Sequence, residues 1–309
     1  MKQSGVDTAV HGDWPSALVS RRWLLGAALA GADMRAAHAV HDMANPLPQA
    51  RPARVALVLS GGGCRGHAHI GLIRALENSG LKPDLVVGSS AGSLVGALYA
   101  AGIGANEMER YGQGVSPNLL RDWVFPKLGI FGGNRIRRFV ADHVGPAKIE
   151  SLPLRFAAVA TDLTSGALVV LDRGDLGLAV QASCSIPGLL EPVRIGERLL
   201  VDGNLSAPLP VVAARRLGAR RVIAADLIFA PTQASLSDPI DVLYQAFSIL
   251  TRKLVIEERE LADLVIAPRL PYRHDMSPTS LKALVDAGER SALDAMPKLR
   301  ALFDTAGQR

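Results

Sequence analysis

Hydrophobic residues fall along the chain in two patterns: short continuous runs, and longer segments in which apolar residues recur every three or four positions. Two of the runs, Val55–Leu59 and Leu85–Val87, are each followed within two residues by a glycine. Continuous apolar runs are typical of parallel strands that are covered on both faces. Further strands are expected at Phe156–Ala160, Leu168–Leu171, Val193–Ile195, Leu199–Val201, Val222–Ala225 and Leu264–Ala267.

Segments with helical spacing lie between these runs. After the first run, Ile70, Ile73 and Leu76 repeat at helical spacing until Gly80 ends the pattern. Other helical patterns are expected at Ser93–Ala101, Ala105–Tyr111, Ile136–Val144, Val211–Leu217, Val242–Leu261 and Leu281–Leu302. Because strands alternate with helices, the sequence predicts an α/β fold class with one doubly wound layer structure.

The composition is that of a globular chain. Of the 309 residues, 49% are hydrophobic and 20% are charged, which excludes a disordered protein. The net charge is +5, but the basic residues are spread along the chain, so we expect a solvated surface and no nucleic-acid partner. Attraction to anionic lipid is the second interpretation of this charge. Cys64 and Cys184 are the only cysteines, so a disulfide framework is excluded, while a single bridge between them stays open.

Residues 1–39 have the pattern of an export signal. Arg21 and Arg22 precede an apolar stretch that runs to Ala32, and Ala37-His38-Ala39 has the small residues that signal peptidase requires. The segment resembles a twin-arginine signal and predicts a periplasmic or otherwise exported protein. If it is an ordinary amphipathic extension, the protein is expected in the cytoplasm. A flexible leader at 40–54 and one folded domain at 55–309 are expected to follow.

The segment Gly88-Ser89-Ser90-Ala91-Gly92 lies between a predicted strand and a predicted helix, which is the position of a nucleophile elbow. In such a turn only small residues fit beside the serine, and its Oγ projects from the strand end near a helix N-terminus, which favours negative charge. Ser90 is therefore the candidate nucleophile, with Gly88 and Gly92 as the glycines of the elbow. The alternative is a helix cap made by Ser89 or Ser90.

A glycine-rich loop follows the first strand and opens the first helix. Consecutive backbone N–H groups in such a loop form a concavity that holds an anion, as an acyl-transfer reaction requires where the oxyanion forms. The candidate oxyanion-hole residues are Gly61, Gly62, Gly63, Cys64 and Arg65. The loop also matches the G-x-G-x-x-G fingerprint, so a dinucleotide-binding enzyme is an alternative. That alternative requires an acidic residue at the end of the second strand, whereas this strand leads into the serine elbow.

A hydrolytic serine needs a proton acceptor. Asp202, followed by Gly203, ends the predicted strand Leu199–Val201, and Asp162 is the rival carboxylate. A histidine is the other option, and His274 follows Asp202 in the order of a Ser–Asp–His triad. The remaining histidines after the predicted signal are His41, His67, His69 and His143. Because the reference pKa of aspartate is about 3.9, a Ser–Asp pair needs an aspartate whose pKa is raised by partial desolvation.

Four segments, taken in order, resemble the patatin-like phospholipase family: the glycine loop Gly61–Gly66, the elbow Gly88–Gly92, the segment Ala182–Pro187 and the pair Asp202-Gly203. The resemblance implies a three-layer α/β/α sandwich with a mostly parallel central sheet. It also implies a Ser90–Asp202 dyad without a catalytic histidine, an oxyanion hole from the amides of the glycine loop, and hydrolysis of lipid acyl esters. Asn204 departs from the pattern, because the family usually has glycine or alanine at this position.

The resemblance implies a phospholipid or lysophospholipid substrate. No metal or organic cofactor is expected, since the sequence has no cluster of ligands. The apolar segment Trp123–Phe131 precedes Arg135, Arg137 and Arg138, and is expected to pack as a buried loop or to act as a lid in peripheral contact with a membrane. A protein that keeps the fold but binds a lipid or a partner without turnover is the alternative function. The sequence does not indicate an oligomeric state.

Overall fold

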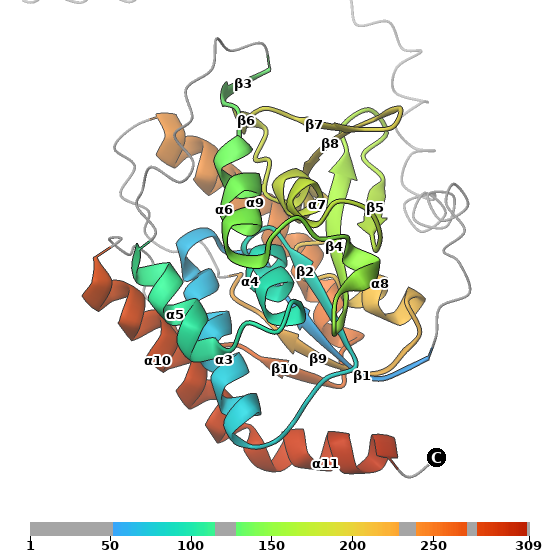
Figure 1. Cartoon of the computed structure of the whole chain (residues 1–309), viewed down its shortest axis with the longest axis vertical. Helices are drawn as coiled ribbons and strands as arrows, with labels where there is room; N and C mark the ends of the chain where they lie inside the picture. The colour runs from blue at the N-terminus through green and yellow to red at the C-terminus, as the bar shows by residue number, and fades with distance from the viewer. Residues whose placement is uncertain (1–51, 115–127, 229–238, 271–276, 308–309) are drawn as a thin grey trace, which may run out of the picture. The chain divides into compact units, whose positions relative to one another are not determined.

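The computed structural model describes residues 52–114, 128–228, 239–270 and 277–307 (Figure 1). The export signal predicted at 1–39 lies outside these residues, as do most of the predicted leader, His41 and His274. The division into leader and domain therefore stays a prediction.

The centre of the fold is a mostly parallel sheet with the strand order β10-β9-β1-β2-β4-β8-β7, in which β5 also pairs with β4. Strands β10, β9, β1, β2 and β4 run parallel, whereas β5 and β8 are antiparallel to β4, and β7 is antiparallel to β8. The strands are β1 Ala53–Leu59, β2 Leu85–Ser89, β4 Arg155–Asp162, β5 Leu168–Leu171, β7 Val193–Ile195, β8 Arg198–Asp202, β9 Ala219–Ala225 and β10 Leu264–Ile266. All the strands predicted from hydrophobic runs are present.

Helices cover both faces of the sheet. Along β1, Leu57 and Leu59 belong to one buried cluster and Ala56 and Val58 to another, because successive side chains of a strand point to opposite faces. The first cluster includes residues of α3, α4, α6, α7, α10 and α11, and the second includes residues of α8 and α9. In Figure 1, α3 lies against both α5 and α10. The structure is therefore a three-layer α/β/α sandwich.

The helices have the following bounds: α3 His67–Asn78, α4 Ala91–Ala100, α5 Ala105–Gly114, α6 Asn134–Val144, α7 Leu176–Ser183, α8 Val211–Arg216, α9 Pro239–Glu260, α10 Pro278–Asp294 and α11 Met296–Gly307. Short 3₁₀ segments are η1 Gly63–Gly66, η3 Ile149–Ser151 and η4 Gly203–Leu205. None of the helices in the described ranges combines the length and the apolar character that crossing a membrane requires.

The structure differs from the pattern-based prediction in three places, one of which is α7, a helix that was not predicted. The helical pattern Leu281–Leu302 is two helices, since Pro297 has no N–H to donate and its ring would clash with the carbonyl one turn before it. A small parallel sheet of β3 (Gly129–Phe131) and β6 (Gly188–Leu190) was not predicted. Residues 123–127 of the predicted apolar loop lie outside the described ranges. In the described part of that loop Phe131 is buried, whereas Leu128 and Ile130 are exposed.

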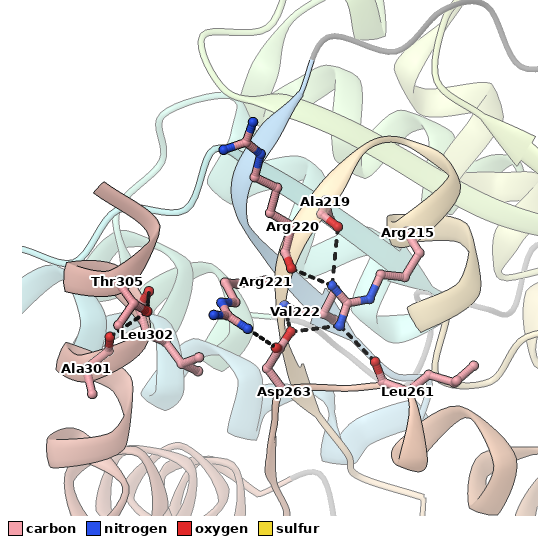
Figure 2. A network of polar contacts seen from close by, with 10 residues as sticks. All are labelled: Arg215, Ala219, Arg220, Arg221, Val222, Leu261, Asp263, Ala301, Leu302 and Thr305. Carbon is pink, nitrogen blue, oxygen red and sulfur yellow. Dashed lines mark hydrogen bonds and ion pairs between the residues drawn. The ribbon is translucent and has the colours of Figure 1, made fainter. Parts of the chain in front are cut away.

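A polar network around Asp263 joins α8, β9 and β10 (Figure 2). Asp263 Oδ2 accepts hydrogen bonds from Arg215 Nη2 at 2.7 Å and from the Val222 N–H at 2.7 Å, and Oδ1 accepts one from Arg221 Nη1 at 2.9 Å. Arg215 also donates to the carbonyls of Ala219, Arg220 and Leu261. Burial acts to raise the pKa of Asp263, but these hydrogen bonds outweigh it and the pKa is lowered.

Candidate active site

Ser90 lies in a sharp turn between β2 and α4. Its φ of 50° makes it the one non-glycine residue with positive φ among the described residues, a conformation that costs about 1–3 kcal/mol. A Cβ on Gly88 would lie 2.4 Å from the Gly92 carbonyl oxygen, and a Cβ on Gly92 would lie 2.2 Å from the Leu59 carbonyl oxygen. Both positions therefore require glycine, as the elbow motif predicted.

The side chain of Ser90 does not cap the helix that follows it. Ser90 is the N-cap residue of α4, yet its side chain makes no capping hydrogen bond. Its Oγ donates instead to Asp202 Oδ2, at 2.8 Å. The neighbouring Ser89 is fully buried, and its hydroxyl donates to Asn204 Oδ1 at 3.1 Å. The structure therefore directs the Ser90 hydroxyl toward a carboxylate and Ser89 away from it.

Asp202 is the last residue of β8, where the pairing with β4 places it opposite Ala160. Its Oδ1 accepts a hydrogen bond from the Asn204 N–H at 2.8 Å, which leaves Oδ2 facing Ser90. Its backbone is held as well, because its N–H donates to the Ser185 carbonyl and its carbonyl accepts from Thr161 Oγ1, both at 2.9 Å. The carboxylate is thus fixed in one orientation.

Burial sets the protonation of this carboxylate. Asp202 is 0% exposed and Ser90 is 6% exposed. Burial raises the pKa of Asp202 to about 7, against the opposite effect of the hydrogen bonds from the Asn204 N–H and the Ser90 hydroxyl. An aspartate with this pKa can accept a proton at neutral pH, which an exposed aspartate does poorly.

The glycine loop begins at the end of β1 and leads through η1 into α3. Of the predicted oxyanion donors, Gly61 already donates its N–H to the Pro208 carbonyl at 3.0 Å, and Arg65 donates to the Gly62 carbonyl at 3.2 Å. Among the described residues, the backbone N–H groups of Gly62, Gly63 and Cys64 have no such partner. Gly63 has a φ of 57°, which favours glycine. Gly62, Gly63 and Cys64 are therefore the predicted donors that the loop leaves available to an anion.

Ser60 and His69 support the loop from the protein interior. The Ser60 hydroxyl donates to the Gly61 carbonyl at 3.0 Å and accepts from the Leu227 N–H at 2.8 Å. His69 Nε2 lies 2.8 Å from the Ser60 carbonyl, which can only accept, so Nε2 carries the proton. His69 is fully buried, and burial lowers its pKa to about 4, which keeps the ring neutral at pH 7. This histidine therefore fixes the start of the loop.

The rival carboxylate and the other described histidines are placed elsewhere. Asp162 Oδ1 accepts hydrogen bonds from the N–H groups of Thr164 and Ser165 in an exposed turn after β4. Burial acts to raise the pKa of Asp162, but these hydrogen bonds dominate and the pKa is lowered. His67 Nδ1 lies 2.8 Å from the Cys64 carbonyl, and His143 Nδ1 lies 2.7 Å from the Phe139 carbonyl. None of the histidines in the described ranges hydrogen-bonds to Ser90 or Asp202.

The segment Ala182–Pro187 contacts both members of the Ser90–Asp202 pair. Ser183 Oγ accepts a hydrogen bond from the Ser90 N–H at 2.9 Å, and the Ser185 carbonyl accepts the one from Asp202. The sequence singled out this segment only as part of the family resemblance and did not predict its contact with Ser90. Its small polar residues, Ser183 and Ser185, were the signal.

Cys64 and Cys184 are both free thiols, so the bridge that the sequence left open is not present. Burial raises the pKa of both thiols, that of Cys184 to about 12, so both are protonated at neutral pH. Within the described residues, no group of His, Cys, Asp and Glu side chains has the arrangement of a metal site.

Comparison with known proteins places this geometry in a family. The family model described as patatin-like phospholipase matches residues 57–215, a range that contains the glycine loop, the elbow and Asp202. The chain belongs to the patatin-like phospholipase family. The resemblance carried by the four ordered segments is thereby confirmed.

Individual proteins are similar to this chain over part of their length. An uncharacterized NTE family protein of Mycobacterium tuberculosis is 40% identical over 177 residues, 56% of this chain and 49% of that protein. Patatin-like phospholipase domain-containing protein 6 of Mus musculus is 36% identical over 181 residues, 56% of this chain and 13% of that protein. The crystal structure of VipD from Legionella pneumophila aligns with a TM-score of 0.43 at 14% identity, over 83% of this chain and 68% of that one. The chain thus spans about half, or less, of the length of the mycobacterial and mouse relatives.

Proposed function

We propose that the chain is a serine hydrolase that cleaves the acyl esters of lipids, with Ser90 as the nucleophile and Asp202 as the proton acceptor. The hydrogen bond of 2.8 Å between Ser90 Oγ and Asp202 Oδ2 is the observation that carries the proposal. Membership of the patatin-like phospholipase family supports a phospholipid or lysophospholipid substrate.

The reaction would proceed in two steps. In the first, Ser90 Oγ attacks the ester carbonyl and its proton passes to Asp202 Oδ2, while the N–H groups of Gly62 and Gly63 donate to the oxyanion. The tetrahedral intermediate collapses, Asp202 protonates the leaving alcohol, and an acyl-serine remains. In the second step Asp202 takes a proton from water, whose oxygen attacks the acyl carbon. The ester bond to Ser90 then breaks, the fatty acid leaves, and Asp202 returns the proton to Ser90 Oγ.

The proposal is tested with the full chain and three variants on a chromogenic ester of a medium-chain fatty acid. Ser90→Ala and Asp202→Asn are each expected to lower kcat by at least about 10³-fold, because each removes one member of a coupled pair. Asp162→Asn is the matched control and keeps wild-type activity, since Asp162 lies in an exposed turn away from Ser90. Full activity in folded Ser90→Ala would overturn the mechanism.

A fluorophosphonate probe separates the hydrolase from a protein that binds lipid without turnover. The probe reacts with an activated serine, so wild type is expected to be labelled and Ser90→Ala is not. An unlabelled wild type with no esterase activity would favour the binding protein. Product analysis by mass spectrometry on a mixed lipid extract then identifies which ester is cleaved.

A further inference from the structure

Asn204 lies where three parts of the site meet. It follows Asp202 and Gly203 in η4 and is 8% exposed. Its backbone N–H donates to Asp202 Oδ1 at 2.8 Å, and its side-chain Oδ1 accepts from the Ser89 hydroxyl at 3.1 Å. One residue thus hydrogen-bonds both to the proton acceptor and to the serine that precedes the nucleophile.

The third contact is with the glycine loop. A Cβ on Gly61 would lie 2.1 Å from Asn204 Oδ1, 2.3 Å from Nδ2 and 2.5 Å from Cγ. The three nearest atoms all belong to the side chain of Asn204, and Gly61 does not have the left-handed backbone that would itself disfavour alanine. The nearest obstacle to a side chain at position 61 is therefore the side chain of Asn204.

Gly203 shows the contrast. A Cβ on Gly203 would lie 2.4 Å from the Val159 carbonyl oxygen, which belongs to the backbone of β4 and cannot move aside. The obstacle at Gly61 is a side chain, which a substitution can remove. The contact between Gly61 and Asn204 can therefore be tested by substituting each residue alone and both together.

We propose that Asn204 is a positioning residue that holds the carboxylate, the elbow and the glycine loop in one arrangement, and that Gly61 and Asn204 form a complementary pair with room for one side chain. With Oδ1 of Asp202 engaged by the Asn204 N–H, Oδ2 is the oxygen that faces Ser90. The amide side chain keeps the elbow and the start of the glycine loop at a fixed separation. The inference rests on the proposed function for its effect on activity.

The test uses Gly61→Ala, Asn204→Gly and the double variant. In Gly61→Ala the new methyl group displaces the Asn204 side chain or the loop, and kcat is expected to fall by about 100-fold, the size of effect seen when an oxyanion donor is lost. Asn204→Gly loses the contact with Ser89 and is expected to lower kcat by about tenfold with little change in KM, because substrate binding is untouched. The double variant is expected to be at least about tenfold more active than Gly61→Ala.

The decisive result is whether kcat of the double variant is higher than that of Gly61→Ala. If the two substitutions acted independently, their losses in kcat would multiply and the double variant would be the less active. A double variant no more active than Gly61→Ala overturns the complementary pair, and wild-type activity in Asn204→Gly overturns the positioning role. Ser89→Ala is the matched control for the side-chain hydrogen bond and is expected to reproduce the kcat loss of Asn204→Gly; if it keeps wild-type kcat, that bond is not what positions the site.

A second measurement keeps the pair testable without activity. The melting temperature is expected to fall in Gly61→Ala and to recover in the double variant. If Gly61→Ala does not fold, the double variant must yield folded protein, and its failure to do so counts against the pair. If wild type neither hydrolyses esters nor reacts with fluorophosphonate, the proposed function fails, while the melting temperatures still decide whether Gly61 and Asn204 are complementary.

Discussion

The backbone N–H of Ser90 donates a hydrogen bond of 2.9 Å to Ser183 Oγ, at the carboxyl end of α7. The strained residue of the elbow is thereby tied to a helix that lies 93 residues further along the chain. We expect Ser183→Ala to lower kcat by about tenfold, because the buried N–H loses its acceptor and the turn is less firmly held. Ester hydrolysis at saturating substrate measures the effect. An unchanged kcat in a folded variant would show that the bond does not position Ser90.

Under the proposed mechanism, the pH dependence of hydrolysis is expected to follow the ionisation of Asp202. Its pKa is raised to about 7 by burial, and only the ionised form accepts the proton of Ser90. The ratio kcat/KM is therefore expected to rise with pH and to reach half of its maximum near pH 7. A midpoint near pH 4, as for an exposed aspartate, would contradict this role.

The raised pKa of Asp202 also predicts that the stability of the protein falls as pH rises, whereas activity rises. Between the unfolded pKa of about 3.9 and the folded pKa, the native state binds more protons than the unfolded state, so this group makes the protein less stable as pH rises. Asp202→Asn removes the ionisation. The free energy of unfolding is measured by urea unfolding at pH 5 and at pH 8. From the lower to the higher pH, the difference between variant and wild type is expected to move in favour of the variant by at least about 1 kcal/mol. An equal difference at the two pH values would argue against a raised pKa.

His69 is expected to act through the glycine loop and not through proton transfer. His69→Ala removes the donor to the Ser60 carbonyl and leaves a cavity, so kcat is expected to fall by about tenfold or more. The pH midpoint of kcat/KM is expected to stay where wild type has it, because the ring is neutral throughout this range. A shifted midpoint would give His69 a direct part in the proton transfer.

Asp263 stabilises the sheet away from the candidate site. Asp263→Asn weakens three hydrogen bonds to a charged acceptor and is expected to cost about 1–3 kcal/mol of unfolding free energy at pH 7 with kcat unchanged. The pKa of Asp263 is lowered, so its contribution is present above its unfolded pKa of about 3.9 and is lost as pH falls below that value. Urea unfolding at pH 7 and pH 3 should show the difference shrink. A constant difference would mean that charge is not its source.

The predicted export signal can be tested by substituting its two arginines. The twin-arginine pattern predicts that the full chain reaches the periplasm and that replacing both Arg21 and Arg22 with lysine leaves it in the cytoplasm. Fractionation of cells that express the two forms measures this. Periplasmic protein in equal amounts from both forms would indicate a different route.

Much of the fold and the pairing of Ser90 with Asp202 could be predicted because the informative residues sit at the ends of buried strands. The carboxyl ends of β1 and β2, which run parallel, lie at one edge of the sheet, so the glycine loop and the elbow had to be neighbours. Asp202 ends an antiparallel strand, and its approach to Ser90 across 112 residues was predicted only with the help of the family resemblance.

Other features left no readable pattern in the sequence. Strands β3 and β6 are three residues each, too short for a period to show. Helix α7 is buried almost all round, so it lacks the polar face that marks a surface helix. The space that Asn204 occupies beside Gly61 depends on how η4 packs against the glycine loop, and no local rule predicts that packing.

The left-handed turn at position 90 has a consequence for how this chain should be compared with its relatives. Glycine adopts such a conformation without penalty, so the fold by itself would be better served by Ser90→Gly. The chain has a serine at a position whose backbone conformation favours glycine. The role proposed for the Ser90 hydroxyl explains why a serine is present there. A relative without catalytic activity would gain stability from glycine at this position, so we expect the serine to be replaced in such relatives.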